Sequence, residues 1–175
     1  LKRYGLNVYD VMYSPISGGS WVVYFSKIKI TKSEKLIELE NQDEKNAINS
    51  YERWLKFAEK VEIHSEKIKQ IVFNENEKIP AYGASARSST LLNYCGINSD
   101  HISIVIDKNP LKAGLYTAGS NIPIVSFDEG LSEIKKTNKI LLLAWNFQDE
   151  IISELREAGF LGEFIIPLPG DPYIL

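Results

Sequence analysis

A turn led by a glycine carries the residues of this chain best suited to binding an anion. Residues 79–94 pass from a short apolar strand through Gly83 into an amphipathic helix. Glycine permits a tight turn, and the helix that follows presents unpaired N–H groups and the positive end of its dipole. Ser85 offers a capping oxygen, and Arg87 adds a fixed positive charge in the first helical turn. The pattern is typical of a nucleotide-phosphate loop.

The dinucleotide fingerprint G-x-G-x-x-G is only partly present in this loop. Gly83 is its first glycine, whereas Ser85 and Ser88 occupy the second and third positions. Asp107 ends the next predicted strand, where Rossmann units carry an acidic residue that receives a ribose hydroxyl. Two interpretations stay open. Either these residues contact a ligand, or they are the glycine turn and the aspartate after a strand that ordinary βαβ units also have.

From residue 77 onward the sequence alternates between short apolar strands and amphipathic helices. Strands are predicted at 78–82, 102–107, 122–125, 139–145 and 163–167, with helices at 88–95, 128–135 and 148–158. Alternation at this spacing predicts right-handed βαβ crossovers. The fold class is therefore α/β, with a Rossmann-like, mostly parallel sheet and flanking helices.

Polar and aromatic residues follow three of these strands, at the edge where parallel sheets bind ligands. These candidates are Tyr82, Asp107, Asn109, Lys112, Trp145 and Asn146. Structural roles are the alternatives for three of them. Asn146 suits the N-cap of the next helix, Trp145 suits the core, and Asp107 can pair with Lys108 or Lys112.

The first 76 residues divide into a β-rich and a helical region. Residues 6–13 and 21–27 predict an antiparallel hairpin, which is expected to complete a sheet lying mostly outside this chain. A long helix is predicted from about Glu44 to Phe73, preceding the sheet domain. Its apolar stripe comprises Ile48, Tyr51, Trp54, Leu55, Ala58, Val61, Ile68, Ile71 and Val72. We expect this stripe to pack on the α/β unit, which gives three regions at 1–30, 31–76 and 77–175.

Composition excludes several classes of function. The 175 residues are 44% hydrophobic and carry a net charge of −3, which indicates a globular protein without a nucleic-acid or membrane partner. Cys95 is the only cysteine, which excludes an internal disulfide and fits the reducing cytoplasm. His64 and His101 lack the spacing of metal ligands, so no metal site is expected. The sequence shows neither a membrane span nor a signal peptide.

Three ordered blocks carry a resemblance to a known family. They are AYGASARSSTLLNYCGI, IDKNPLKAGLYTAGSNIPI and LLLAWNFQDEI. Together they resemble the C-terminal domain of S-adenosylmethionine-dependent C-methyltransferases that act on nucleotide-linked deoxysugars. The match runs from about Lys78 to Pro169. Residues 1–27 resemble the closing hairpin of the methyltransferase domain that precedes it, and the remainder of the first 76 residues then forms a helical connector.

Four residues depart from the family pattern. Arg87 stands in place of a lysine, which keeps the charge but supplies a planar fork suited to phosphate oxygens. Ala118 and Ala144 replace prolines, and Ser17 stands where a histidine often precedes two glycines. If that histidine assists at the active site in the family, this chain lacks it.

The resemblance implies a three-part enzyme: a zinc-bearing segment, a methyltransferase domain that holds S-adenosylmethionine, and this domain closing over a dTDP-type sugar nucleotide. The cofactor loop and the proton-transfer groups are then expected upstream of Leu1, so we assign no catalytic residue and no cofactor to this chain. Its implied share is substrate binding. The residues implied are Gly83, Ala84, Ser85 and Arg87 at the diphosphate, Asp107 or Asn109 at sugar or ribose hydroxyls, and Tyr82 or Trp145 in apolar contact.

Two other functions stay open. One is a free-standing Rossmann module that binds NAD or another nucleotide, although a Cβ atom at Ser85 would crowd a pyrophosphate. The other is an interaction domain without a ligand, in which the long helix provides a dimer or interdomain surface. The sequence upstream of Leu1 would separate these alternatives from the methyltransferase.

Overall fold

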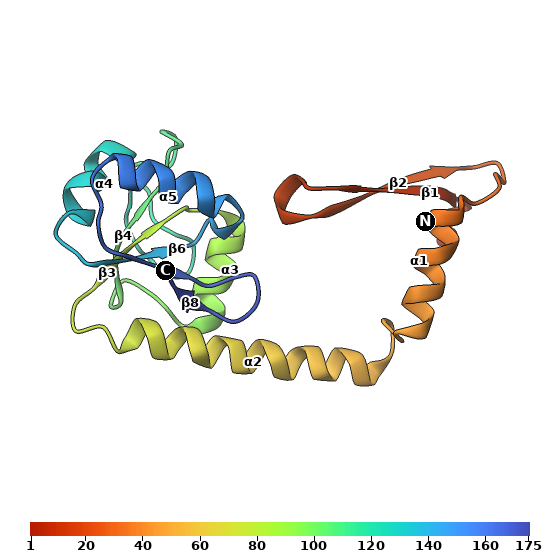
Figure 1. Ribbon diagram of the computed structural model, residues 1–175, viewed down its shortest axis with the longest axis horizontal. Helices are drawn as coiled ribbons and strands as arrows, with labels where there is room; N and C mark the ends of the chain where they lie inside the picture. Colours follow the sequence, from red (N-terminus) through yellow and green to blue (C-terminus); the bar gives the residue numbers. More distant parts are fainter. The chain divides into compact units, whose positions relative to one another are not determined.

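The computed structural model describes residues 1–175, apart from the side chain of Ser17. It divides into two compact units, Leu1–Glu59 and Lys60–Leu175. The first unit is an antiparallel hairpin followed by helical segments, and the second is a sheet covered by helices (Figure 1).

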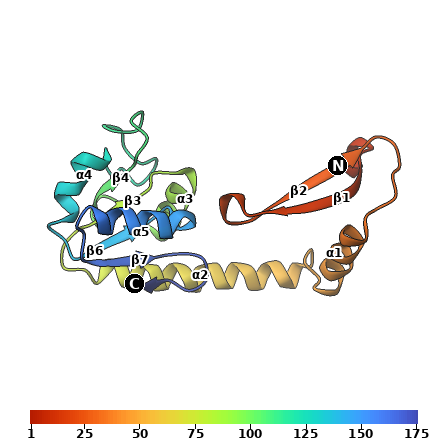
Figure 2. The same ribbon diagram turned by 45° about the horizontal axis from the view of Figure 1, so that its top comes forward.

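The hairpin of the first unit agrees closely with the sequence prediction. A short 3-10 segment, η1 (Lys2–Tyr4), precedes β1 (Asn7–Ser14), and η2 (Ile16–Gly18) joins β1 to β2 (Ser20–Ser26). The two strands pair in antiparallel register and are drawn in red in Figure 2. All side chains of 21–25 in β2 are exposed, so the hairpin buries little apolar surface within its own unit.

The helical region consists of two helices, so the prediction of one helix running through from about residue 44 is wrong. α1 (Glu34–Lys45) ends shortly before Ala47, which takes a left-handed φ of 48°. α2 (Tyr51–Phe73) begins after Ser50, whose hydroxyl accepts the N–H of Arg53 at 3.3 Å. A left-handed residue ends a helix and a serine cap starts one, which together account for the break.

The apolar stripe of α2 is buried only in its second half. Ile68 and Val72 are 0% and 2% exposed in the core of the second unit. Tyr51, Trp54 and Leu55 are 77%, 57% and 47% exposed. The buried residues of the stripe belong to the second unit, whereas the residues before Glu59 belong to the first unit, and packing of that half on the α/β unit stays a prediction.

The second unit is built on a six-stranded sheet with the order β5-β4-β3-β6-β7-β8. Its strands are β3 (Ile79–Tyr82), β4 (Ile102–Ile106), β5 (Ile124–Val125), β6 (Lys139–Leu142), β7 (Glu163–Ile166) and β8 (Tyr173–Ile174). All neighbours are parallel except β7 and β8, which are antiparallel. The prediction of a mostly parallel α/β sheet is confirmed.

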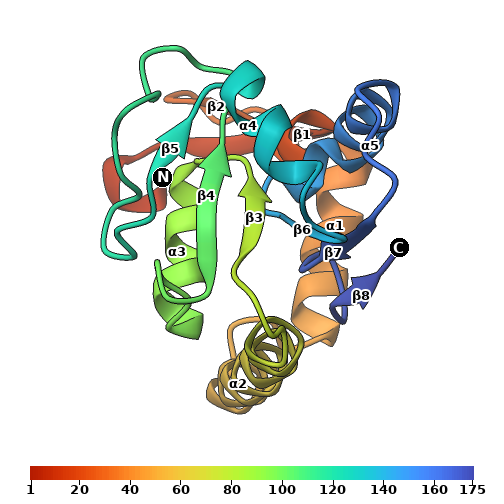
Figure 3. The ribbon, with the colours of Figure 1, turned by 90° about the vertical axis from the view of Figure 1, so that its left-hand side faces the viewer.

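Helices cover both faces of this sheet (Figure 3). α2 and α3 (Ala86–Cys95) bury one apolar cluster, to which Ala81, Val105 and Leu141 contribute from the strands. α4 (Phe127–Ile134) and α5 (Gln148–Glu157) bury a second cluster with the strand residues that point the other way, among them Ile106 and Leu142. Strands buried on both faces read as continuous apolar runs, as this sequence does.

Candidate functional site

The candidate site lies at the carboxyl ends of β3 and its neighbours, where the strand order reverses. From β3 the chain moves outward to β4 and β5, and then returns to β6 on the other side of β3. Such a reversal of strand order leaves a crevice at the carboxyl edge of the sheet, and open α/β sheets bind ligands there. Tyr82 ends β3 and Asp107 follows β4, so both lie at this edge.

Gly83 forms the turn that leads from β3 toward α3. Its φ of +101° lies in a region that side chains other than glycine rarely adopt, and a Cβ atom there would collide with Ala144. The N–H of Gly83 donates to the carbonyl of Ile106 at 2.8 Å, which anchors the turn to β4. The backbone of Gly83 therefore lies directly against the end of β6.

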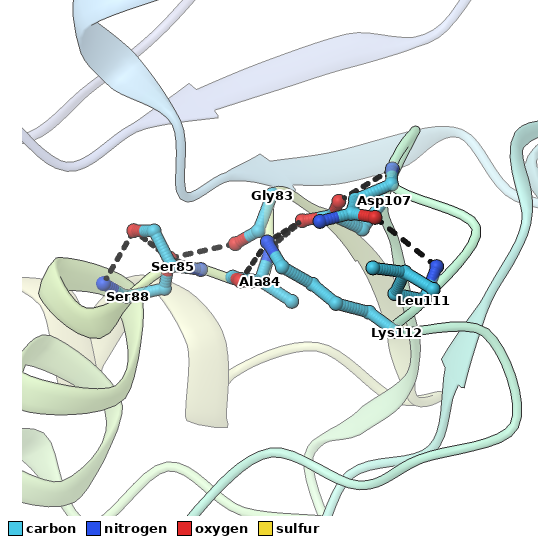
Figure 4. Close-up of polar contacts among 8 residues, drawn as sticks. Gly83, Ala84, Ser85, Ser88, Asp107, Leu111 and Lys112 are labelled. Carbon is cyan, nitrogen blue, oxygen red and sulfur yellow. Dashed lines mark hydrogen bonds and ion pairs between the residues drawn. The ribbon is translucent and has the colours of Figure 1, made fainter.

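Two serines cap α3 and bind the turn to it. Ser85 is the N-cap residue, and its Oγ accepts the N–H of Ser88 at 3.1 Å while its own N–H donates to Ser88 Oγ at 2.8 Å. The Ser88 hydroxyl donates to the carbonyl of Gly83 at 2.6 Å (Figure 4). This reciprocal cap fixes the start of a ten-residue helix, whose positive end faces the turn.

Asp107 links the loop after β4 to the turn after β3. Its Oδ2 accepts the backbone N–H of Ala84 at 2.8 Å and the ammonium of Lys112 at 2.9 Å, while Oδ1 accepts the N–H of Asn109 at 2.9 Å. The same ammonium donates to the carbonyl of Ala84 at 2.7 Å. Asp107 therefore pairs with Lys112, one of the two lysines expected from the sequence. The pair does not lie fully on the surface, because the Asp107 side chain is only 12% exposed.

A cavity of about 310 Å³ opens beside this turn. Its polar wall includes Tyr82, whose hydroxyl donates to Glu154 Oε2 at 3.0 Å, and Lys108, which pairs with Glu154 Oε1 at 2.5 Å. Burial, and next the hydrogen bond to Glu154, raise the pKa of the Tyr82 phenol, so Tyr82 stays protonated at neutral pH. The lining residues are Tyr82, Gly83, Asp107, Lys108, Ala144, Phe147, Glu150, Ile151 and Glu154.

The sequence-predicted residues near β3 and β4 gather around this cavity. Tyr82, Gly83 and Asp107 line it, and three further predicted residues contact Asp107 through the hydrogen bonds described above. Ser85 caps α3, and Arg87 lies exposed in the first turn of the same helix. Contact of these residues with a substrate stays a prediction.

Trp145 and Asn146, the two candidates after β6, lie outside the cavity lining. Trp145 and Asn146 lie in a short 3-10 segment, η3 (Trp145–Phe147), and neither lines the cavity. Trp145 packs against the apolar cluster beneath α5, as the core alternative predicted. Asn146 does not cap α5, since Phe147 occupies the N-cap position and makes no side-chain cap hydrogen bond. The capping interpretation of Asn146 is therefore wrong.

Two acidic lining residues were not selected from the sequence. Glu150 and Glu154 lie one turn apart on α5, and each directly precedes a buried residue, Ile151 or Leu155. Charged residues on a surface helix usually indicate only a solvated face. The signal that could have selected these two glutamates is their i, i+4 spacing. Two like charges at this spacing are unfavourable on an isolated helix, so they suggest a partner elsewhere in the fold.

Among the described side chains, no group of three or more His, Cys, Asp or Glu residues is arranged to hold a metal ion. In the same part of the chain, no helix has the length and apolar character needed to cross a membrane.

Comparison with known proteins identifies a family and a relative. The family described as the C-methyltransferase C-terminal domain matches residues 15–169. The C-methyltransferase NovU of Streptomyces niveus is 30% identical over 183 aligned positions, which cover 99% of this chain and 42% of that protein. The chain thus spans less than half the length of this relative.

Proposed function

Because this chain belongs to the family of C-methyltransferase C-terminal domains, we propose that it is the substrate-binding domain of an S-adenosylmethionine-dependent C-methyltransferase. The proposed substrate is a nucleotide-linked deoxysugar of the dTDP type. An upstream domain of the same protein would hold the cofactor, in keeping with the greater length of the relative.

One observation supports this assignment most directly. The turn from Gly83 to the Ser85 cap of α3 lies at the carboxyl edge of the sheet, next to a cavity of about 310 Å³. A helix N-terminus of this kind favours an anionic group such as a diphosphate, and Arg87 adds a guanidinium that can bind phosphate oxygens in a bidentate manner. Asn109 follows β4 beside this turn and would approach sugar or ribose hydroxyls, while Asp107 and Lys112 hold the turn through their hydrogen bonds to Ala84.

The chemistry of C-methylation limits what these residues do. A base must remove a proton beside a ketone so that the resulting enolate carbon attacks a methyl group, which S-adenosylmethionine supplies when bound. Tyr82 is unsuited to be that base, because its phenol is held in the protonated form. We therefore assign binding and orientation of the sugar nucleotide to this chain and leave proton transfer to upstream residues.

A free-standing NAD-binding module receives less support. In that function the carboxylate after β4 would receive ribose hydroxyls. The Asp107 carboxylate already accepts three hydrogen bonds, from Ala84, Asn109 and Lys112, out of roughly four acceptor positions. Little capacity remains for a ribose.

Isothermal titration calorimetry tests the proposal. The full-length protein is expected to bind both dTDP and S-adenosylmethionine, whereas residues 1–175 alone should give no heat with S-adenosylmethionine. Low-micromolar binding of the cofactor to residues 1–175, or binding of NAD in place of dTDP by the full-length protein, would contradict the assignment.

A further inference from the structure

Lys112 joins two loops that come from different strands. Its ammonium donates to the carbonyl of Ala84, in the turn after β3, and to Oδ2 of Asp107, after β4, at 2.7 and 2.9 Å. The same Oδ2 accepts the N–H of Ala84 at 2.8 Å. Figure 4 shows the closed arrangement that results, in which residue 84 is held by both of its backbone polar groups.

The carboxylate at the centre of this arrangement is itself held in place. Asp107 Oδ1 accepts the N–H of Asn109 at 2.9 Å, and Asn109 Oδ1 accepts the N–H of Leu111 at 3.1 Å. The Asp107 side chain is 12% exposed and that of Lys112 is 35% exposed. Charge-assisted hydrogen bonds in a partly buried position are stronger than those of surface ion pairs, which water and salt weaken.

Ala84 immediately precedes the residue that caps α3. Whatever fixes the peptide group of Ala84 therefore also fixes where Ser85 and the first N–H groups of α3 point. A loop ordered before the ligand arrives loses less conformational entropy on binding, which raises affinity.

We propose that Lys112 is a positioning residue for the anion-binding turn, acting through Ala84 and Asp107 and not through contact with the ligand. The proposal refines the assignment of a diphosphate to this turn and rests on it. It differs from the sequence-based expectation, in which Lys112 and Asp107 both contact substrate.

Hydrogen exchange of the ligand-free full-length protein tests the positioning step by itself. Lys112→Met removes the ammonium and keeps most of the side-chain stem. Amides of residues 83–88 should exchange about tenfold faster in this variant, the scale of one lost charge-assisted hydrogen bond. Lys136→Met is the matched control, since Lys136 pairs with Glu133 at 2.8 Å near the end of α4, outside the turn. It should leave exchange of 83–88 unchanged.

Calorimetry with dTDP tests the consequence for binding. Lys112→Met should weaken dTDP binding by about tenfold. Lys112→Arg keeps the charge, so its amide exchange and its dTDP affinity should both stay close to those of the wild type. The affinity for S-adenosylmethionine should stay the same in all variants.

The outcomes separate the positioning role from the proposed function. Weaker dTDP binding with unchanged exchange would mean that Lys112 contacts the ligand directly, and faster exchange with unchanged dTDP affinity would mean that order in the turn does not matter; either result overturns the inference. Absence of dTDP binding by the wild-type protein would instead overturn the proposed function. The exchange comparison would still decide whether Lys112 orders the turn.

Discussion

A Cβ atom placed on Gly83 would lie 2.6 Å from the Cβ of Ala144 and 3.0 Å from its backbone nitrogen. The turn after β3 and the end of β6 thus approach too closely for a side chain to fit between them. Backbone hydrogen bonds maintain this approach, because the N–H groups of Leu143 and Ala144 both donate to the carbonyl of Tyr82, at 2.9 and 3.1 Å. A proline at position 144, as in the family pattern, would lack one of these donors.

The contact between Gly83 and Ala144 predicts a large effect of Gly83→Ala on stability. The substitution combines a positive φ, which costs a residue other than glycine about 1–2 kcal/mol, with overpacking, which costs about 1–3 kcal/mol. We expect urea titration to show that Gly83→Ala lowers the free energy of unfolding by about 2–5 kcal/mol.

Gly159→Ala is the matched control for this prediction. Gly159 has a similar φ of +91°, but a Cβ atom there would meet no other atom within 4 Å. Gly159→Ala should therefore lower the free energy of unfolding only by the cost of the positive φ, about 1–2 kcal/mol. Equal losses for the two variants would show that the turn moves away from β6 at no cost.

The hydrogen bond between Tyr82 and Glu154 predicts a stability difference that depends on pH. Tyr82→Phe removes the hydroxyl and should cost about 1 kcal/mol near neutral pH. Burial raises the pKa of Tyr82 in the folded protein above the value of about 10 found in the unfolded chain. The native state therefore keeps a proton that the unfolded chain releases at high pH, so wild-type stability falls as the pH rises above about 10.

Urea titrations of wild type and Tyr82→Phe at several pH values check this sign. The advantage of the wild type should be constant up to about pH 9 and should shrink as the pH passes about 10, since only the wild type carries the linked proton. A stability difference that grows with pH would contradict the raised pKa.

The parallel sheet could be predicted because its strands carry their own signal. The run Ile140–Leu143 is apolar throughout, and strands alternate with amphipathic helices at βαβ spacing. The edge strand β8 was not predicted, because two residues are too few to show a period and its pairing depends on β7 opposite. The break between α1 and α2 was also missed. Ala47 takes a left-handed conformation that the high helix propensity of alanine argues against.

The candidate site was predictable where one residue type performs one task. Gly83 is required by its φ and by close approach, and Ser85 is a favoured cap, so both could be selected from the chain. The role of Asp107 was less predictable, because its three donors come from tertiary contacts and from the fold of its own loop. Glu154 reaches Tyr82 across 72 positions of sequence, a contact that depends on how α5 lies over the sheet.

The exposure of Trp54, in the first half of α2, predicts a small effect of Trp54→Ala on stability. Truncating a buried tryptophan to alanine costs about 3–5 kcal/mol of stability. Trp54, however, is 57% exposed and contacts Phe57 edge-on, with 5.9 Å between the ring centroids. We expect a loss of only about 0.5–1.5 kcal/mol, the value of such an aromatic pair. Ile68→Ala, at a fully buried position of the same helix, should lose about 2–5 kcal/mol.

Thermal unfolding of the two α2 variants distinguishes the alternatives. A melting temperature that falls as far for Trp54→Ala as for Ile68→Ala would mean that another surface covers Trp54. That result would favour the function in which this helix provides an interaction surface.

The position of Arg87 in the first turn of α3 predicts that it contacts a phosphate of the substrate. Arg87→Ala in the full-length protein should weaken binding of the nucleotide sugar by about 1.5–3 kcal/mol, the scale of a hydrogen bond to a charged group. Calorimetry measures this loss directly, and circular dichroism checks that the fold is retained. Lowering the salt concentration should strengthen binding more for the wild type than for the variant, because exposed charges interact less when screened.

Arg53→Ala provides the matched control for Arg87→Ala, because Arg53 is also an exposed arginine in the first turn of a helix, in this case α2. Both variants remove a positive charge from a helix N-terminus, where arginine opposes the helix dipole, and circular dichroism checks that each variant keeps its fold. Only Arg87 lies next to the turn at Gly83, so only its removal should weaken nucleotide-sugar binding. An equal dissociation constant for the wild type and both variants would assign Arg87 to the solvated surface and leave the turn and the cap of α3 to bind the diphosphate alone.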